Sequence, residues 1–576
     1  MITSPAQELD GATVEIVRSY LDSAVEQARR TLVRTSFNPV IYEVLDFGIS
    51  LYDRDLRLMA EAPGITHFLG ANDYAIVKGV EYVGRDTLRP GDVVMLNYPY
   101  WNSAHSYDAM LFAPIFLDPS DPGPVGYLCV RAHWMDLGGK DAAYILDSTD
   151  MHQEGMIFPG TRVVKGGRVD EEILELIRFN SRLPDLTIGD FHAQLSAIRV
   201  GEERVRQVYE KFGVETVGAA VEAVLDHGER IVRRALAELP DGEWTAVDWL
   251  DDDGISTEPV KMQVRIAIRG EEIEFDFSGS SPAVRGPINM PVGATESLAK
   301  VALKGLAAPT VPNSAGLYRT LTVIAPPGTL FHAVYPAATF TLWTSMGAHD
   351  LIHKALAQPL EHVGASSGAD EPGFMATGVH PDTGEVYVLS NNEGIGWGGT
   401  PEHDGSTALQ HASTSVVRNT PIEVLEHKAA LFHERLALRA DSGGAGRHRG
   451  GLGIERAVRF TADGEVLSMK KKTRTRPWGL AGGHEAMTNG MTIHPGTPEE
   501  RTLSMRRAPM PEGSRFVNVS AGGGGYGDPL TRDPVAVAED VLDGYVSRAA
   551  ARDVYGVEVA ADGTWTETAA RVRGPE

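Results

Sequence analysis

Glycine is concentrated in the second half of the chain, and this limits what that half can fold into. The densest stretches are 443–446, 450–453 and 522–527, and few long helical patterns occur beyond Leu317. Glycine weakens helix interiors, and its missing Cβ lets the backbone turn tightly or approach another group closely. We therefore predict a β-dominated C-terminal half. Its glycine runs either form tight turns or bring backbone amides close to an anion or to another chain.

Helical periodicity dominates the first half instead. Apolar residues recur there every three to four positions, which indicates helices that pack one face on a core. We predict helices over Thr13–Arg34, Glu171–Asn180, Glu202–Phe212, Val221–Ala237, Ser297–Ala308, Ser345–Ala357 and Val535–Ala551. Apolar or alternating runs predict strands over Asp46–Asp53, Leu56–Ala60, Val93–Leu96, Tyr127–Arg131, Lys261–Ile268 and Glu272–Phe277. The first two of these strands are expected to form a hairpin.

These patterns together predict an α+β protein with several domains. With 576 residues, of which 42% are hydrophobic, the chain can bury more than one core. We expect an N-terminal α/β region at 1–240, a β-rich and glycine-rich region at 241–530, and a helical tail at 531–576. The first boundary follows from the change to short alternating runs near Trp244.

Charge and cysteine content limit the partners and the compartment. The chain has 53 basic and 78 acidic residues, and its net charge of −25 opposes binding to nucleic acid or to anionic membranes. The one cysteine, Cys129, lies in an apolar strand pattern and is expected to be a buried, inert thiol. We therefore expect no intramolecular disulfide, and a cytoplasmic location. We also expect no secretory signal and no membrane span, because no long apolar stretch is present.

Nucleotide-binding motifs are missing. The glycine runs include neither a Gly-x-x-x-x-Gly-Lys-Ser/Thr loop nor a Gly-x-Gly-x-x-Gly segment between a strand and a helix. We therefore expect this chain to bind no ATP or dinucleotide. One basic run, Lys470–Arg476, interrupts the acidic chain. A solvated strand is its simplest interpretation, and contact with an acidic partner subunit is the alternative.

Two short segments each place a histidine three residues before an aspartate: His105-Ser-Tyr-Asp108 and His133-Trp-Met-Asp136. The first follows a predicted strand and is polar and turn-rich, so we infer that a turn or bulge brings His105 and Asp108 together. Imidazoles with one carboxylate hold Zn²⁺, Mn²⁺ or Fe²⁺ and leave coordination positions open, as a catalytic metal requires. Among 18 histidines such pairs also arise by chance, so the spacing allows a metal site without requiring one.

Other residues are weaker candidates for catalysis. Ser280 and Ser281 lack the Gly-x-Ser-x-Gly pattern of a nucleophile elbow, and Cys129 lacks an exposed, electropositive setting. A covalent mechanism is therefore disfavoured. His152 and Glu154 follow the histidine–aspartate pairs closely. They are interpreted either as acid–base residues or as part of a loop that shapes the substrate site.

Many motifs occur in a fixed order over nearly the whole chain. They are Asn97-x-Pro-Tyr100, His105-x-x-Asp108, His133-x-x-Asp-x-Gly-Gly139, Gln153-Glu-Gly155, Gly286-Pro-Ile-Asn289, Asn419-Thr-Pro-x-Glu-Val-Leu-Glu426, Asp441-Ser-Gly-Gly-Ala-Gly-Arg447 and Gly522-Gly-Gly-Gly-Tyr-Gly-Asp-Pro529. In this order they resemble the hydantoinase B/oxoprolinase family.

The resemblance implies the B-type subunit of an ATP-dependent enzyme. The A-type partner subunit would hold ATP, and the B-type subunit would complete the reaction. The ligands of a divalent metal, Zn²⁺ or Mn²⁺, would be His105, Asp108 and His133. Asp136 would not bind the metal itself but would orient the imidazole rings of the ligands. Either Asp136 or Glu154 would accept a proton from the attacking water.

Two reactions are compatible with the resemblance. The first, which we expect, is hydrolysis of a cyclic amide such as a hydantoin, 5-oxoproline or a lactam. The second is carboxylation of a ketone such as acetone or acetophenone. Amide-opening members carry Asn-Asp-Pro-Tyr, whereas this chain has Asn97-Tyr-Pro-Tyr100, and Ile41–Asp53 and Phe68–Asp73 are also more similar to the carboxylase branch. A third possibility is a non-catalytic scaffold that completes the partner's active site.

Overall fold

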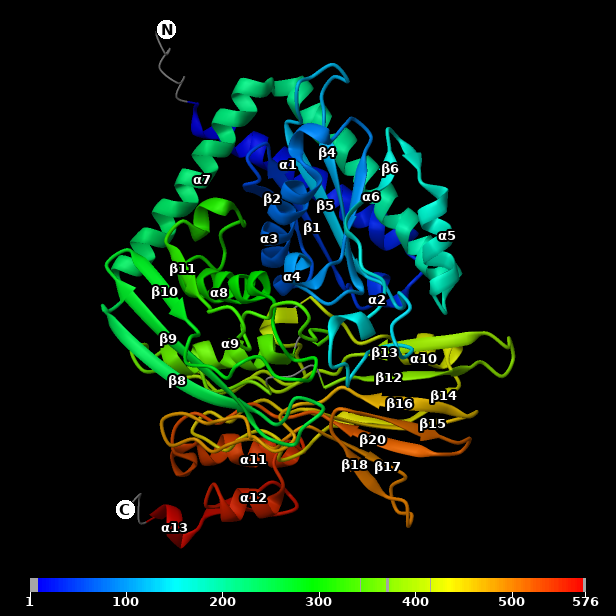
Figure 1. Cartoon of the computed structure of the whole chain (residues 1–576). Coiled ribbons are helices and arrows are strands. Elements are labelled where there is room, and N and C mark those ends of the chain that lie inside the picture. The colour runs from blue at the N-terminus through cyan, green and yellow to red at the C-terminus, as the bar shows by residue number, and fades with distance from the viewer. Residues whose placement is uncertain (1–8, 342, 369–371, 415, 573–576) are drawn as a thin grey trace. The chain divides into compact units, whose positions relative to one another are not determined.

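The computed structural model describes residues 9–341, 343–368, 372–414 and 416–572. The chain forms two compact units: unit 1 is 1–243, 265–278 and 289–342, and unit 2 is 244–264, 279–288 and 343–576. Of the predicted regions, 1–240 lies in unit 1, 531–576 lies in unit 2, and 241–530 contributes to both. Helices and sheets occur in both units (Figure 1), which confirms the predicted α+β, multi-domain class.

Unit 1 is built around a seven-stranded antiparallel sheet with the order β2-β1-β5-β4-β3-β6-β7. Its strands are β1 (Phe47–Asp53), β2 (Leu58–Ala62), β3 (Val93–Leu96), β4 (Asp108–Ile115), β5 (Gly126–His133), β6 (Pro159–Lys165) and β7 (Arg168–Val169). Its helices are α1 (Gly11–Thr35), α2 (Pro39–Tyr42), α3 (Thr66–Val83), α4 (Pro99–Asn102), α5 (Glu171–Asn180), α6 (Pro184–Phe212), α7 (Val214–Ala237) and α8 (Val292–Ala307).

The central strands of this sheet are buried on both faces, because alternate side chains enter two different cores. Leu111 of β4 and Leu128 of β5 lie in the core that also holds side chains of α1 and α6. Phe112 and Cys129 lie in the core formed with α3. The predicted buried thiol is thus confirmed, and burial raises the pKa of Cys129 well above its ordinary value.

Most predicted elements form close to their expected bounds. Helix α5 spans the predicted residues, α1 extends the first predicted helix by a few residues, and β1 and β2 pair as the expected hairpin. The predicted continuous helix over Val535–Ala551 is wrong. It is divided into α11 (Pro534–Leu542) and α12 (Arg548–Asp553), because Gly544 adopts a φ of 76° between them.

Unit 2 contains two sheets that share one core, with the orders β13-β12-β16-β19 and β14-β15-β20-β17-β18. Their strands are β12 (Phe374–Val379), β13 (Val386–Asn391), β14 (Leu431–Leu438), β15 (Ile454–Phe460), β16 (Gly464–Ser468), β17 (Gly490–Ile493), β18 (Arg501–Leu503), β19 (Arg506–Met510) and β20 (Arg515–Val519). The other helices of the unit are α9 (Trp343–Leu356), α10 (Ile422–Lys428) and α13 (Ala569–Val572).

The strands β21 (Val557–Val559) and β22 (Trp565–Glu567) pair with each other. A four-stranded sheet has the order β11-β10-β9-β8, with the strands β8 (Gly242–Leu250), β9 (Val260–Arg269), β10 (Glu272–Asp276) and β11 (Leu321–Ile324). The 3-10 helices are η1 (Arg85–Thr87), η2 (Met151–Gln153), η3 (Ala315–Tyr318), η4 (Ala412–Thr414) and η5 (Pro529–Thr531).

The glycine-rich segments of unit 2 pack backbone directly against backbone. The amide of Gly444 donates to the carbonyl of Gly523 at 2.8 Å, and the amide of Gly451 donates to the carbonyl of Trp397 at 2.8 Å. A Cβ atom on Gly450 would lie 1.7 Å from the carbonyl oxygen of Gly523. These glycines provide room for neighbouring backbone of the same unit, so the tight-turn interpretation is wrong for them, and the close approach is not to another chain.

The three lysines of the basic run are buried, whereas Arg474 and Arg476 are exposed, and the run follows β16 instead of forming a strand, so the prediction of a solvated strand is wrong for the lysines. Lys470, Lys471 and Lys472 are at most 2% exposed. The ammonium of Lys471 lies 2.6 Å from a carboxylate oxygen of Asp252, and that of Lys472 lies 3.0 Å from Asp248. Because these carboxylates belong to the same unit, the lysine charges are neutralised inside it and need no acidic partner subunit.

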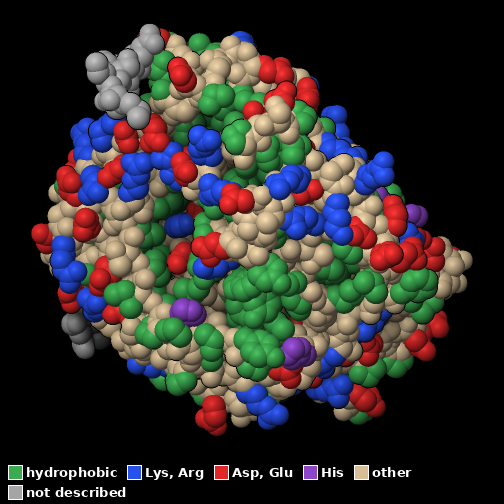
Figure 2. Space-filling model, turned by 45° about the horizontal axis from the view of Figure 1, so that its top comes forward, with side chains coloured by type: hydrophobic (Ala, Val, Ile, Leu, Met, Phe, Trp, Pro, Cys, Tyr) green, Lys and Arg blue, Asp and Glu red, His purple; other side chains and the backbone are tan. Residues whose placement is uncertain are grey.

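One face of the molecule carries charges of both signs. Figure 2 shows acidic and basic side chains interspersed over this face, around an area of hydrophobic side chains in its lower centre. In the part of the chain that the structure describes, no helix combines the length and the apolar character that crossing a membrane requires.

Candidate metal centre

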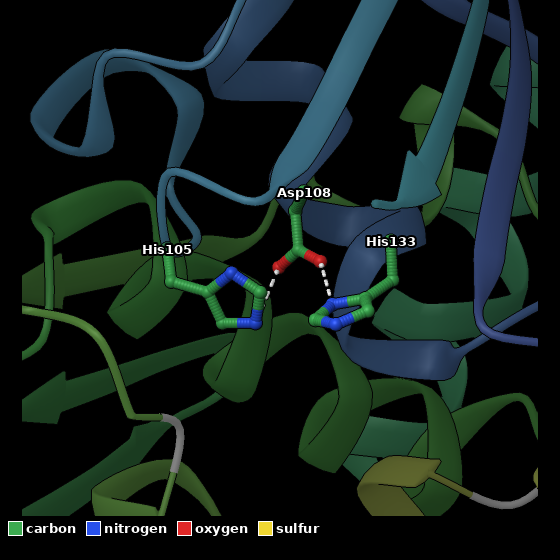
Figure 3. Close-up of side chains that lie close together, drawn as sticks. All are labelled: His105, Asp108 and His133. Atoms are coloured by element: carbon green, nitrogen blue, oxygen red, sulfur yellow. Dashed lines mark hydrogen bonds and ion pairs between the residues drawn. The ribbon is translucent and has the colours of Figure 1, made fainter. Parts of the chain in front are cut away.

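Two of the predicted ligands lie opposite each other on paired strands (Figure 3). Asp108 begins β4, His133 ends β5, and the two residues are direct partners in the antiparallel register. Directly opposed residues project their side chains to the same face of the sheet. The hydrogen bond from the side-chain amide of Asn102 to the carbonyl of Asp108, at 2.8 Å, fixes the start of β4.

The third ligand, His105, reaches the same place through a turn. Helix α4 ends at Ser103, whose φ of 63° is left-handed and redirects the chain. The amide of Asp108 then donates to the carbonyl of His105 at 3.1 Å, which closes a tight turn between them. The turn that was inferred from the polar sequence is therefore present, and it converts the His-x-x-Asp spacing into proximity.

The three side chains form one compact, buried group. The Nε2 atom of His105 lies 3.4 Å from Oδ2 of Asp108, and Nδ1 of His133 lies 3.1 Å from Oδ1 of the same carboxylate. The ring centroids of the two histidines are 4.9 Å apart. None of the three residues is more than 2% exposed. One ligand atom from each lies within 4.8 Å of the others, so a single ion could contact all three.

The protonation states suit a cation. Burial lowers the pKa of His105 to about 3, so its imidazole is neutral near pH 7. Burial alone would raise the pKa of Asp108, but His105, His133 and Arg131 hold it below its ordinary value. A neutral imidazole and an ionised carboxylate are the forms that bind metals.

Two atoms of the group have unused bonding capacity. Nδ1 of His105 and Oδ2 of Asp108 are buried and have no hydrogen-bond partner among the residues that the structure describes. A buried polar atom left without a partner costs roughly 1–3 kcal/mol. A divalent ion beside Asp108 would satisfy the carboxylate, so the residues present fit the metal that the resemblance implies.

Aromatic rings enclose the histidines, and no local sequence pattern marks Phe340 among them. Phe340 stacks on His105 with centroids 5.0 Å apart and planes at 11°. Tyr144 stacks on His133 at 5.8 Å, and its hydroxyl lies 3.2 Å from Nε2 of His105. Phe340 is distant in sequence from the motifs. Tyr144, which follows the second histidine closely, is an acid–base candidate that its position after Gly138-Gly139 could have suggested.

A buried positive charge lies on the same face of the sheet. Arg131 is fully buried, donates to Asn72 and to the carbonyl of Asn102, and leaves Nη1 without a partner among the described residues. Burial lowers its pKa to about 10, so it remains cationic at pH 7. Both ring nitrogens of the buried His67 also lack partners in the described chain, and burial lowers the pKa of His67 to about 4.

Glu154, one of the two predicted catalytic carboxylates, is fully buried but binds other groups. Its Oε1 accepts hydrogen bonds from the hydroxyl of Ser148 at 2.7 Å and from the amides of Thr339 and Phe340 at 2.9 and 3.2 Å. Burial raises its pKa to about 7. Glu154 therefore holds the segment that stacks on His105. A proton-accepting role for it stays a prediction.

Asp136, the other predicted catalytic residue, is also buried and fully bonded. Its carboxylate accepts from the guanidinium of Arg182 at 2.8 Å, from the hydroxyl of Tyr107 at 3.2 Å and from the amide of Gly138 at 3.2 Å. The ring of Tyr107 packs edge-on against Phe340, with centroids 4.9 Å apart. Asp136 thus supports, through Tyr107, the rings of Phe340 and Tyr144, which we call the aromatic wall of the site. Its predicted role as a base or as an orienting group stays a prediction.

A family model described as hydantoinase B/oxoprolinase matches residues 10–529 of the chain. The chain belongs to this family. The resemblance seen in the order of the motifs is confirmed.

Two relatives are similar over nearly their whole length. The B component of a "Putative D-/L-hydantoinase" from Pseudomonas sp. (strain NS671) is 31% identical, and the match covers 97% of each chain. The beta component of the caprolactamase of Pseudomonas jessenii is 28% identical over 97% of this chain and 98% of its own. The names of both relatives describe them as subunits.

Solved structures share the fold. The crystal structure of the ATP-dependent caprolactamase from Pseudomonas jessenii matches with a TM-score of 0.88 and 26% identity, over 97% of this chain and 98% of that one. A nucleotide-free acetone carboxylase structure also matches with a TM-score of 0.88, over 98% and 82% of the two chains. At 20% identity, the second match establishes the fold alone.

Proposed function

We propose that this chain is the metal-binding B-type subunit of an ATP-dependent enzyme that hydrolyses a cyclic amide, with ATP bound by a separate A-type subunit. The observation that carries the proposal is the buried group of His105, Asp108 and His133 in a member of the hydantoinase B/oxoprolinase family. The relatives with 31% and 28% identity bear hydantoinase and caprolactamase names, which supports amide hydrolysis over carboxylation. The name of the second relative supports a lactam among the substrates to test.

His105, Asp108 and His133 would hold the ion, and a bound Zn²⁺ or Mn²⁺ would supply Lewis acidity to polarise a carbonyl and to activate water. The surrounding residues have separate tasks. Phe340 and Tyr144 fix the imidazole planes and exclude bulk water from one side. The hydroxyl of Tyr144, 3.2 Å from Nε2 of His105, is the acid–base group placed to hold a proton beside the cluster.

Arg131 contributes charge. Its cationic guanidinium lies on the face of the sheet that carries Asp108 and His133, and it favours the ionised form of Asp108. The same field would stabilise negative charge that develops on a carbonyl oxygen during hydrolysis. Asp136 and Glu154 would act on this site through Tyr107 and Phe340, the side chains they hold.

Ketone carboxylation is the second candidate. The segment Asn97-Tyr-Pro-Tyr100 favours it, because Tyr98 replaces the aspartate of amide-opening members. Tyr98 also packs edge-on against Tyr100 and Trp101, with centroids 5.2 and 4.8 Å apart. Such a ring cluster would suit an aryl substrate.

The test is an assay of the complex reconstituted with the A-type subunit. ATP turnover is measured with hydantoins, 5-oxoproline, lactams and aryl ketones, each with and without bicarbonate. ATP turnover that requires an amide and is independent of bicarbonate supports hydrolysis. ATP turnover that requires both a ketone and bicarbonate supports carboxylation instead. A scaffold without catalytic function would bind no stoichiometric transition metal at His105, Asp108 and His133, so metal analysis separates that third possibility.

A further inference from the structure

We propose that His349, Asp350 and His411 of unit 2 bind a second divalent transition-metal ion, and that Zn²⁺ suits this site. One ligand atom from each residue lies within 4.8 Å of the others. The residues are 4%, 2% and 1% exposed. Two imidazoles with one carboxylate form a nitrogen-rich donor set, which zinc accepts readily. The inference is independent of the proposed reaction, because it concerns a different group of residues in a different unit.

The three residues come from two segments of unit 2. His349 and Asp350 lie on α9, and His411 directly precedes η4. The rings of His349 and His411 meet edge-on, with centroids 5.2 Å apart. One helical turn further along α9, the ring of His353 lies 4.4 Å from that of His349. His353 is not one of the residues whose ligand atoms lie together, so the proposed protein ligands are the other three.

Unpaired nitrogens distinguish this group from an ordinary buried hydrogen-bond network. Nδ1 of His349 and Nε2 of His411 are buried without a hydrogen-bond partner among the described residues. Nε2 of His411 lies 3.7 Å from Oδ1 of Asp350, which is too long for a hydrogen bond. Ligand atoms at roughly 2.0–2.2 Å from a tetrahedral zinc ion are themselves roughly 3.4 Å apart, so an ion would require only a small closure.

Serine hydroxyls form hydrogen bonds to two of the proposed ligands and orient them. Ser366 donates to Oδ2 of Asp350 at 2.7 Å, and the hydroxyl of Ser367 lies 3.1 Å from each oxygen of the same carboxylate. The hydroxyl of Ser413 lies 2.7 Å from Nδ1 of His411. With a metal on Nε2, the ring proton would reside on Nδ1 and be donated to Ser413, an arrangement that fixes a histidine ligand.

The backbone amide of Ser413 also points at this nitrogen, at 3.2 Å. In the neutral ring without metal, Nδ1 would accept from that amide and Nε2 would carry the proton. Binding at Nε2 therefore moves the ring proton to Nδ1, which then donates to the hydroxyl of Ser413 and no longer accepts from the backbone amide. The enclosed position indicates an ion that links α9 to the 411–414 segment.

Zinc stoichiometry tests the site. The full-length chain and its variants are stripped with a chelator, dialysed against Zn²⁺ and analysed for bound metal. We expect two equivalents in the wild type, one in His105→Ala, one in His349→Ala and none in the double variant. His433→Ala is the matched control and should keep two. The side chain of His433 is similarly buried in unit 2, but it belongs to no three-ligand group found among the described residues.

Milder substitutions cover the case in which His349→Ala fails to fold. Asp350→Asn and His411→Gln keep most of the side-chain volume, and circular dichroism confirms their folding. Zn²⁺ should raise the melting temperature of His105→Ala, which retains only this site, and should not raise that of His105→Ala combined with His411→Gln. Folded Asp350→Asn and His411→Gln that bind as much Zn²⁺ as the wild type would overturn the proposal, whatever the occupancy of the unit 1 site. Loss of the reaction alone would not affect it.

Discussion

The two histidine–aspartate groups contain the same residue types but differ in what surrounds them. In unit 1, one oxygen of Asp108 makes no hydrogen bond among the described residues, and an aromatic hydroxyl from Tyr144 faces His105. In unit 2, hydroxyls of Ser366 and Ser367 occupy both oxygens of Asp350. Ligand identity alone therefore does not decide the chemistry. A carboxylate with spare capacity beside an acid–base group suits catalysis, whereas one held by hydroxyls suits a structural ion.

The strongest test of this contrast removes a ligand of the first group. His105→Ala and His133→Ala should each lose the unit 1 metal and lower turnover of the reconstituted complex about 1,000-fold, because the metal's several kcal/mol of activation is lost. Metal analysis, kinetics and circular dichroism measure the effect. His192→Ala, an exposed histidine of α6, is the control. Full activity with unchanged metal content would remove the distinction between the two groups.

The next effect concerns pH and Glu154. Its folded pKa of about 7 lies above the ordinary value of 4.5, so its contribution to stability is complete below pH 4.5 and is lost as the pH rises through 7. The loss amounts to roughly 3 kcal/mol at most. Glu154→Gln stays neutral, so the difference in unfolding free energy between wild type and variant should change over this range.

Urea unfolding of the chelator-treated chain at pH 4.5, 5.5, 6.5 and 7.5 measures this difference. Taking the difference cancels other buried carboxyl groups with raised pKa values, such as those of Asp190 and Glu202. If the unfolding free energies of wild type and variant change in parallel with pH, Glu154 is ionised over the whole range from pH 4.5 to 7.5. That result would favour its role as a base.

Asp136→Asn should keep the fold and most of the metal yet lower turnover about 10–100-fold, because an amide neither accepts a proton nor holds Tyr107 and Arg182 as a carboxylate does. Steady-state kinetics at saturating ATP measures it. If the change costs less than about 1 kcal/mol of stability and the rate stays within twofold of wild type, Asp136 only caps its turn.

The smallest effect is expected at the aromatic wall. Phe340→Leu removes the ring stacked on His105, and such ring contacts are worth about 0.5–1.5 kcal/mol. Turnover should fall roughly 2- to 10-fold with the metal retained. Phe374→Leu, a buried ring in the core of unit 2, is a matched control for general packing loss and should not change turnover. Equal effects of both substitutions would show that the wall has no specific task.

The first group could be predicted because its ligands lie near each other in sequence and their motifs follow a family order. The sequence predicts the strand before His133, but β4, which begins at Asp108, is not among the predicted strands, so the direct pairing of Asp108 with His133 comes from the structure. Sequence patterns do not reveal Phe340, because stacking on His105 depends on a segment that only tertiary packing brings there. The same holds for His411 beside Asp350 in unit 2.

The buried lysines show why local charge is a weak guide. The run Lys470–Arg476 predicts a solvated strand, but its lysines are buried, because Asp248 and Asp252 come from a distant segment and supply compensating charge to Lys472 and Lys471. Glycine-rich stretches are misleading in a similar way. Whether a glycine serves a turn or a close backbone contact depends on the neighbouring segment, as for Gly450 against Gly523.

Because Cys129 of β5 is buried against α3, the native chain should not react with maleimide or other thiol-directed dyes. Any cysteine introduced at the surface would then be the one site that reacts, without a cysteine-free background having to be built first. A pair placed with one residue on each unit would carry donor and acceptor fluorophores. Energy transfer between them would report on movement of the units during turnover in the assembled enzyme.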